Sequence, residues 1–173
     1  TKFIKRVIYM AMIYITWYYS LDEYYDTAKL NQGNPTIPNP LGIPGFFAQV
    51  GKQVIESMQS LVPVDTGYLK STIFYWNSGY WNNHMSGGVG AGAKYAGAVN
   101  AGSRPLMPPL LYLPGWALRH WGNLGPDTVV KAGQYLQQYI AKYGTKARPF
   151  IEAGISEANA IKPPYGFLTV TYD

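Results

Sequence analysis

Cysteine is absent from this chain, which excludes disulfide bonds and thiolate metal sites. Histidine is nearly absent: His84 and His120 are the two that occur, and neither stands in a metal-binding spacing such as H-E-x-x-H. A G-x-S-x-G nucleophile elbow is also missing. We therefore predict no catalytic residue, no metal site and no cofactor, and we interpret the chain as a protein that is not an enzyme.

Charged residues are scarce as well. They make up 13% of the chain, whereas a typical soluble domain carries about 25%. Aromatic residues reach 16%, among them 16 Tyr and 5 Trp. Tyr and Trp combine an apolar body with a polar tip, which suits surfaces that become buried on assembly. We therefore expect a subunit with large interfaces.

Among these few charged residues, the basic ones outnumber the acidic ones. The net charge is +5 and the sequence pI is near 9.3, which permits an acidic partner such as nucleic acid. The 14 Lys and Arg residues are spread along the chain without a basic block. We expect non-specific contact with nearby DNA, and no sequence-specific binding.

Near the beginning of the sequence, residues 7–21 carry no formal charge, and Asp22 and Glu23 follow them. A membrane-spanning helix needs about 20 apolar residues, and this run is shorter and rich in Tyr. No small-residue cleavage site of a secretory signal follows it. We predict a helix or strand that packs on the rest of the subunit or on a neighbour; a membrane-anchored protein is the alternative hypothesis.

Proline, asparagine and glycine dominate residues 31–45, which read NQGNPTIPNPLGIPG. Proline removes backbone donors and favours extended geometry in the preceding residue. The composition predicts a linker over residues 31–45 that separates an N-terminal arm (1–30) from a core domain (46–173).

Within the core, helical and strand patterns alternate. Apolar residues recur every three or four positions from Phe46 to Val62, which predicts a helix that Pro63 ends. A second amphipathic pattern runs from Pro126 to Tyr143 and stops at Gly144. The other predicted elements are strands at 69–76, 94–100 and 167–172, a loop or hairpin at 77–92, an irregular connection at 102–115, and helical pieces at 116–121 and 147–160. This mixture predicts an α+β fold, with two or more helices on a small antiparallel sheet and an N-terminal arm.

The glycine-rich stretch 87–92 resembles two nucleotide-binding patterns only loosely. A dinucleotide fingerprint needs a helix after the glycines, and the residues that follow here favour a strand. A phosphate loop needs Gly-Lys-Ser/Thr after its spacer, and this sequence has Gly92-Ala93-Lys94-Tyr95 instead. We therefore predict a flexible hairpin tip.

The tripeptide Asp65-Thr66-Gly67 has two interpretations. Asp and Thr bond local backbone donors and Gly accepts positive φ, which predicts an ordered turn. The same tripeptide carries the catalytic carboxylate of aspartic proteases, in which two such groups share a proton. A homodimeric aspartic protease is therefore a second functional hypothesis.

Three motifs in order carry a family resemblance. Residues 63–73 read PVDTGYLKSTI after a helix, residues 95–102 read YAGAVNAG, and residues 144–151 read GTKARPFI after a second helix. This order resembles the tail-completion, or head–tail joining, family of long-tailed bacteriophages over residues 46–158. Members show P-V-D-T-G-x-L-x-x-S-I, then Y-A-x-x-V-x-x-G, then R-P-F. Members often have an acidic residue where Asn100 stands and Thr where Ser103 stands, and the arm has no counterpart.

The resemblance implies a structural virion protein of the phage neck, assembled in the host cytoplasm. Such subunits form rings around the DNA path, here with six copies favoured and twelve possible. The implied partners are other copies of the chain, neck and portal-side proteins, tail-tube or tail-terminator proteins, and DNA in the lumen, with no membrane. The residues to which the resemblance assigns structural roles are Pro63, Asp65, Thr66, Gly67, Leu69, Tyr95, Gly102, Arg148, Pro149 and Phe150. In this reading Asp65 and Thr66 hold the helix-to-strand corner, and Arg148, Pro149 and Phe150 anchor the C-terminal segment.

Overall fold

The computed structural model describes residues 11–19, 42–81, 84–163 and 166–172. Residues 1–10 and 20–41, which hold most of the predicted arm and linker, lie outside the described residues. The element order is β1 (Ala11–Tyr18), α2 (Gly42–Leu61), α3 (Tyr68–Ser71), β2 (Ile73–Trp81), β3 (His84–Ala91), α4 (Ala96–Ala101), the 3-10 helix η1 (Leu110–Tyr112), α5 (Leu113–Trp121), α6 (Pro126–Tyr143), α7 (Ile151–Ala160) and β4 (Phe167–Tyr172).

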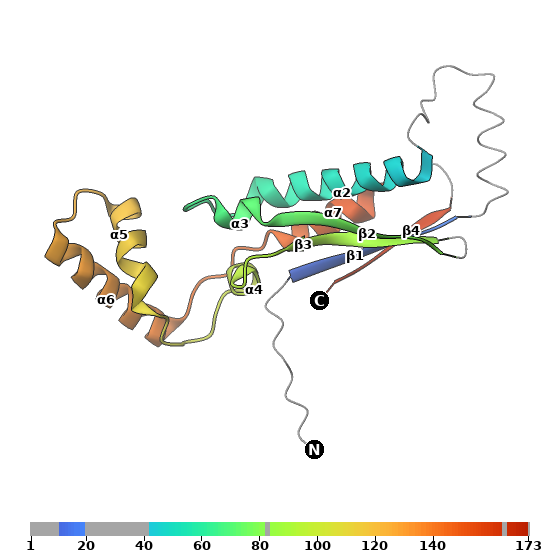
Figure 1. Cartoon of the computed structure of the whole chain (residues 1–173). Coiled ribbons are helices and arrows are strands. Elements are labelled where there is room, and N and C mark those ends of the chain that lie inside the picture. Colours follow the sequence, from blue (N-terminus) through green and yellow to red (C-terminus); the bar gives the residue numbers. More distant parts are fainter. Residues whose placement is uncertain (1–10, 20–41, 82–83, 164–165, 173) are drawn as a thin grey trace.

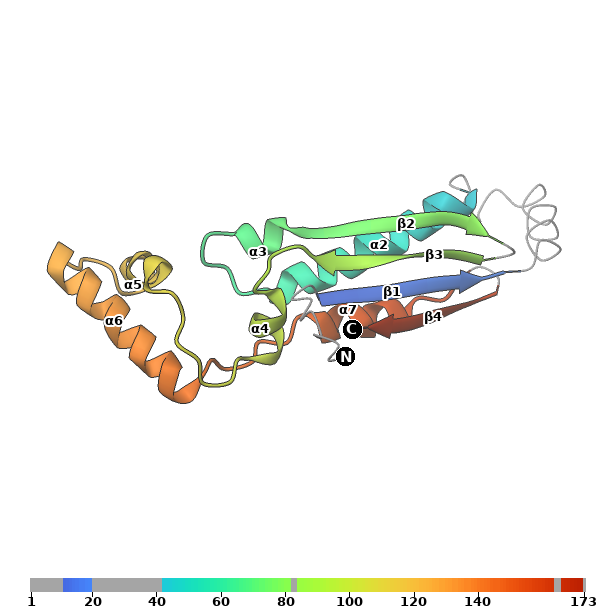
Figure 2. The same cartoon turned by 60° about the horizontal axis from the view of Figure 1, so that its bottom comes forward.

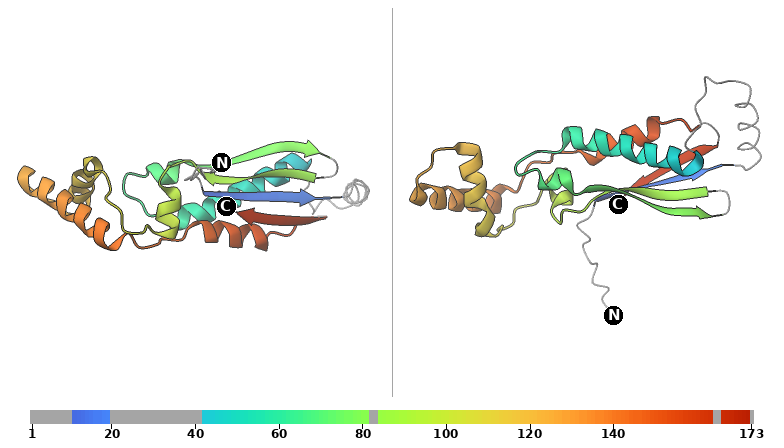
Figure 3. Two further views of the ribbon diagram at one scale, coloured as in Figure 1. Left: turned by 90° about the horizontal axis from the view of Figure 1, so that it is seen from below. Right: turned by 45° about the horizontal axis from the view of Figure 1, so that its top comes forward.

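The predicted α+β class is confirmed, because helices pack on a four-stranded antiparallel sheet of order β2-β3-β1-β4. Figure 1 and Figure 2 show α2 and α7 side by side on one face of this sheet. The left view of Figure 3 looks at the opposite face, where the strands lie in front of both helices. We call the sheet with α2, α3, α4 and α7 the sheet body.

Strand β1 lies inside the sheet, between β3 and β4. Its alternate residues Ile13, Ile15 and Trp17 are buried in the core that α2 and α7 cover. Residues 11–18 therefore form a strand that packs on the rest of the subunit, as predicted for the uncharged run 7–21, and this strand belongs to the same sheet as the core strands. Without β1, β4 would have no ladder partner and β3 would keep only β2, so this segment completes the sheet.

Helix α2 confirms the helix predicted from Phe46 onward, and it begins earlier, at Gly42. Residues 42–45 therefore form its first turn and do not belong to a linker. Phe47, Val50, Val54 and Met58 recur on its buried side, as their spacing predicts. The helix ends before Pro63, where the Val62 amide still donates to the Met58 carbonyl oxygen at 3.1 Å.

The strand predicted at 69–76 starts only at Ile73, because a short helix, α3, occupies Tyr68–Ser71. Local hydrogen bonds explain the difference. The hydroxyl of Ser71 donates to the Tyr68 carbonyl oxygen and that of Thr72 to the Leu69 carbonyl oxygen, both at 2.9 Å. Such bonds compete with a strand ladder. Gly67, just before α3, has φ of 81°, in agreement with the predicted positive φ.

The glycine-rich stretch is no hairpin tip, and this prediction is wrong. Gly87, Gly88 and Gly90 are buried in β3, an interior strand paired on both sides. A Cβ at Gly88 would collide with the carbonyl oxygen of Ile13 in β1, and one at Gly87 with the carbonyl oxygen of Trp76 in β2. Glycine is used here because the neighbouring strands leave no room for a side chain. The predicted hairpin itself exists, as β2 and β3.

The strand predicted at 94–100 is also wrong, since Ala96–Ala101 form helix α4. The small residues of this segment fit either structure, and its packing decides between them. Ala96 is fully buried against the core, and the carbonyl oxygen of Val99 accepts a hydrogen bond from the Arg148 amide at 2.9 Å. The bond comes from a linking segment and not from a neighbouring strand.

Helices α5 and α6 pack on each other and project from one end of the sheet body (Figures 1 and 2). Gly133 of α6 lies against the ring of Pro114, where a Cβ would come within 2.7 Å of its Cγ. The predicted helices at 116–121 and 126–143 are confirmed, with α5 starting earlier at Leu113 and Gly144 ending α6 at φ of 73°. Within the predicted irregular connection 102–115, Leu110–Tyr112 form η1. We call residues 103–148 the helical lobe.

The strand predicted at 167–172 is confirmed, and the helical piece predicted at 147–160 is confirmed from Ile151 onward. Helix α7 spans Ile151–Ala160 and buries Ile151, Gly154 and Ala158 against α2 and β1. Strand β4 spans Phe167–Tyr172 and pairs with β1 at the edge of the sheet.

Candidate interaction surface

Two segments link the helical lobe to the sheet body, and they are bonded to each other at its base. The Ser103 amide donates to the Thr145 carbonyl oxygen at 3.1 Å, and the Thr145 amide donates to the Ser103 carbonyl oxygen at 3.2 Å. Gly102 precedes this bridge with φ of 75°, and a Cβ there would lie 2.6 Å from the Thr145 carbonyl oxygen. Gly102 is therefore required by its backbone geometry at the start of the lobe.

Asp65 makes a second connection between body and lobe. Its carboxylate accepts two hydrogen bonds from Arg119 of α5, from Nε at 2.7 Å and from Nη2 at 2.5 Å. His120 Nε2 lies 3.2 Å from the same carboxylate. The hydrogen bond from Arg119 lowers the pKa of Asp65 below its ordinary value, against the opposing effect of partial burial. Two-point pairs between Arg and a carboxylate fix orientation as well as distance.

Asp65 was expected to hold the helix-to-strand corner together with Thr66. In the structure, other residues of the motif form that corner. The Tyr68 amide lies 3.4 Å from the Thr66 hydroxyl, and Gly67 supplies the positive φ. Leu69 is buried in the core, and Pro63 is half-buried directly after α2. Nothing in the sequence indicated Arg119 or His120 as partners, because an ion pair between distant positions leaves no local pattern.

The first two motifs meet beside this corner. The ring of Tyr95 lies 6.4 Å from that of Tyr68, centroid to centroid. Burial, followed by the nearby Tyr68 and Asp65, raises the pKa of Tyr95. Both rings keep large exposed areas, so the corner presents an aromatic surface next to α5.

The second and third motifs meet through Asn100. Its Oδ1 accepts hydrogen bonds from the amides of Phe150 and Ile151, both at 2.9 Å, and so satisfies two donors at the start of α7. Phe150 is fully buried, whereas Arg148 and Pro149 are exposed. Of the predicted C-terminal anchor residues, Phe150 anchors by its side chain and Arg148 by its backbone. In the sequence, Asn100 stood out only as a departure from the family pattern.

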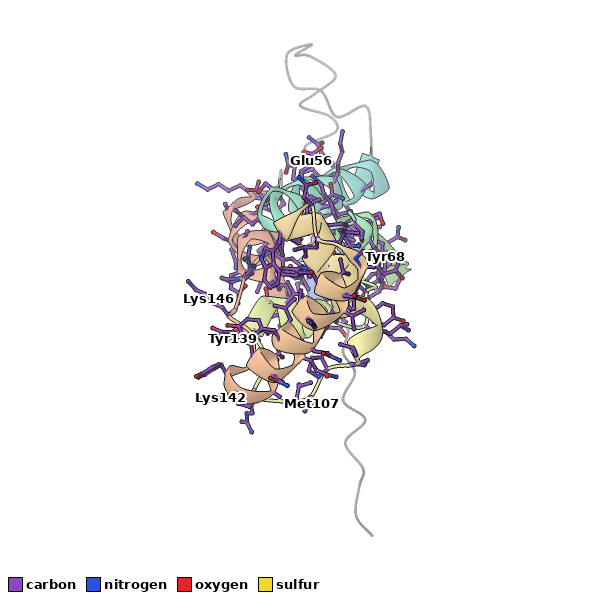
Figure 4. The ribbon with its side chains drawn as sticks, turned by 90° about the vertical axis from the view of Figure 1, so that its left-hand side faces the viewer. Glu56, Tyr68, Met107, Tyr139, Lys142 and Lys146 are labelled. Carbon is purple, nitrogen blue, oxygen red and sulfur yellow. The ribbon has the colours of Figure 1, made fainter. Side chains whose placement is uncertain are left out.

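The helical lobe carries most of the exposed apolar surface. Ten of the eighteen large apolar side chains that are exposed in the described residues belong to it. They are Leu106, Met107, Leu111, Tyr112, Leu118, Trp121, Val130, Tyr135, Tyr139 and Tyr143. Figure 4 views the molecule from the lobe end and shows Tyr139 and Met107 on its outer surface. Concentrated exposure of this kind marks an interaction surface.

The helical lobe also carries the net charge of the protein. It contains six basic residues and one acidic residue, Asp127, an excess of five. The remaining eight basic and eight acidic residues of the chain balance each other. Counting charge separately for each segment, instead of along the whole chain, would have found this asymmetry in the sequence.

In the described part of the chain, no group of three or more His, Asp or Glu side chains is arranged to hold a metal ion. Its helices also include none with the length and apolar character needed to cross a membrane. Comparison with family models, with curated proteins and with solved structures found no match.

Proposed function

We propose that this chain is a structural virion protein of a long-tailed bacteriophage, a neck or tail-completion subunit that forms a ring joining head to tail around the DNA. The three motifs and their order support the proposal from the sequence. In the fold, those motifs lie together: the corner at Asp65 meets Tyr95, and Asn100 of the second motif caps the helix that follows the third. The ring has six copies in the favoured arrangement and twelve in the alternative.

The observation that carries the proposal is the exposed apolar surface of the helical lobe. Leu111 and Tyr112 are 78% and 72% exposed, and eight further large apolar side chains share the lobe with them. A soluble monomer gains nothing from exposing these side chains, whereas a ring subunit buries those of η1 and α5, Leu111 and Tyr112 among them, against its neighbour and leaves the outer side of α6 free. The Tyr and Trp content fits the core of a protein interface, where aromatic residues are enriched.

The shape of the subunit supports the same reading. The sheet body and the projecting lobe make an elongated molecule, in which the Ser103–Thr145 bridge closes the base of the lobe and the Asp65–Arg119 pair links the lobe to the body (Figures 2 and 3). Ring interfaces are heterologous: one surface of a subunit contacts a different surface of the next. A projecting lobe provides one such surface and a sheet body the other.

The environment of Asp65 does not favour the aspartic protease hypothesis. A catalytic pair of carboxyl groups shares a proton, so one of the two must hold a raised pKa. Both oxygens of the Asp65 carboxylate are instead bound within the subunit by the guanidinium of Arg119, which leaves the group poorly placed to share a proton with a second carboxyl. An assay with peptide substrates at acid pH tests the hypothesis directly, with Asp65→Asn as the control.

Electron microscopy of lysates tests the neck function. A phage that lacks this gene should produce filled heads beside separate tails, and supplying the protein should restore joined particles. Joined, infectious particles without the gene would contradict the proposal. A parallel measurement of the purified protein's mass by light scattering over a range of concentrations should detect self-association.

A further inference from the structure

The cations of the helical lobe are available to a partner outside the subunit. Of its six basic residues, Arg119 is paired with Asp65. The other five are exposed, and none forms an ion pair within the described residues. They are Arg104, Lys131, Lys142, Lys146 and Arg148. The only carboxylate of the lobe, Asp127, belongs to the first turn of α6.

Helix α6 arranges part of this charge in a line. With 3.6 residues per turn, Lys131, Tyr135, Gln138 and Lys142 fall within about 60° of the helix circumference and extend about 16 Å along its axis. All four are exposed. Gly133 lies on the opposite side of the helix, against Pro114 of α5. This line, which we call the α6 stripe, therefore faces away from the rest of the lobe.

The side chains of the α6 stripe share one chemical property, since each offers a hydrogen-bond donor and none is a carboxylate. Figure 4 shows that Lys146, just beyond the helix, lies on the same side of the lobe as Lys142 and Tyr139. Lys, Tyr and Gln are among the side chains that contact phosphate oxygens in protein–DNA complexes. A row of such donors suits a polyanion with closely spaced charges.

We propose that the α6 stripe together with Lys146 is the DNA-contacting surface of this subunit, binding the phosphate backbone of duplex DNA without regard to base sequence. The inference rests on the proposed function for the identity of the polyanion. A subunit arranged radially in the ring points one end toward the axis, and the lobe is the end that carries the net charge. The stripe lysines act as point charges, which attract phosphate without selecting a sequence.

The test compares two variants that remove the same charge from different places. The lobe variant is Lys131→Gln with Lys142→Gln and Lys146→Gln. The body variant is Lys70→Gln with Lys94→Gln and Lys162→Gln, three exposed lysines that form no ion pair within the described residues. Binding to a labelled mixed-sequence DNA duplex is measured by fluorescence anisotropy as salt rises from about 50 to about 200 mM.

The wild type should bind with an affinity that falls steeply with salt. For the lobe variant, the slope of log affinity against log salt concentration should become shallower by about 0.9 for each lysine removed. At low salt this variant should bind DNA roughly tenfold or more weakly than the wild type. The body variant should stay within about twofold of the wild type. A third variant, Lys131→Arg with Lys142→Arg and Lys146→Arg, should retain binding, which separates loss of charge from any fault in folding.

Three results would overturn the DNA surface. The first is that the wild type does not bind DNA, or binds it with an affinity that salt does not change. The second is that the lobe and body variants lose DNA affinity equally. The third is unchanged DNA binding with a loss of self-association in the lobe variant alone, which would identify the stripe as a protein interface.

The neck function is tested separately, by microscopy of particles made without the gene. Stripe-dependent DNA binding with normal joining would overturn the neck function and support the surface. Failed joining without stripe-dependent binding would overturn the surface only.

Discussion

Asp65 and Arg119 are 54 residues apart in the chain, and their side chains form a two-point ion pair that joins the loop before α3 to helix α5. This pair holds the helical lobe against the sheet body, and the Ser103–Thr145 bridge holds together the two segments at the base of the lobe. A residue from the most recognisable motif of the sequence therefore acts at the junction between the two parts.

Loss of the ion pair should loosen the lobe before it affects the body. For Asp65→Asn we expect faster amide hydrogen exchange in α5 and a decrease of about 1 kcal/mol or less in the free energy of unfolding, because the pair is partly exposed to solvent. Asp127→Asn, which changes the other carboxylate close to the lobe helices, should leave exchange in α5 unchanged. Faster exchange confined to α3 would instead assign Asp65 to the corner.

The same pair predicts a pH dependence at the acid end. The hydrogen bond from Arg119 lowers the pKa of Asp65 in the folded protein, so its stabilising effect is complete above the unfolded value of about 3.9. This effect is lost as the pH falls from that value through the folded pKa. Urea midpoints of the wild type and Asp65→Asn should therefore differ at neutral pH and converge in acid; a constant difference would contradict the prediction.

Gly88 should not tolerate a side chain. A Cβ there would press on the carbonyl oxygen of Ile13 in the neighbouring strand, so Gly88→Ala should cost about 1–3 kcal/mol of unfolding free energy. Gly125→Ala is a suitable control, because Gly125 has φ of −64° and a Cβ added to it would meet no other group within 4 Å. Chemical denaturation measures both variants, and equal stability of the two would refute the packing argument.

The side-chain oxygen of Asn100 should contribute more to the stability of the protein than its side-chain nitrogen. Asn100→Ala removes the acceptor for the amides of Phe150 and Ile151 and should cost about 1 kcal/mol, the typical effect of losing a helix cap. Asn100→Asp keeps that acceptor but replaces the Nδ2 group that donates to Glu152, so its stability should lie between those of the wild type and the Ala variant. Thermal unfolding measures the order, and an Asp variant less stable than the Ala variant would contradict it.

The apolar surface of the lobe should serve association and contribute little to folding. Leu111→Ser with Tyr112→Ser should change the unfolding free energy by about 0.5 kcal/mol or less, because both side chains are largely exposed. The same variant should weaken self-association in light scattering. Leu61→Ser, at an exposed position of the sheet body, is the control; equal effects of the two changes would remove the lobe from the interface.

The elements that the sequence predicted correctly are those marked by local chemistry. Pro63 follows α2, Pro126 begins α6 and Gly144 ends it, and each acts through its own backbone geometry. The alternation in Phe167–Tyr172 likewise predicted β4. The incorrect predictions at 87–92 and 94–100 concern small residues, whose short side chains allow strand, helix and turn alike.

The sequence by itself determined the α+β class, the two long helices, the positive φ of Gly67 and the excess of aromatic residues with a basic balance. Tertiary structure alone decided that β1 joins the sheet, that Gly88 lies close to the Ile13 carbonyl oxygen of β1, that Asn100 caps α7 and that Asp65 binds Arg119. Helix and turn signals depend on residues a few positions apart, and so they are visible in the chain. Strand partners and ion pairs depend on which distant segments meet, and only the packed core determines that.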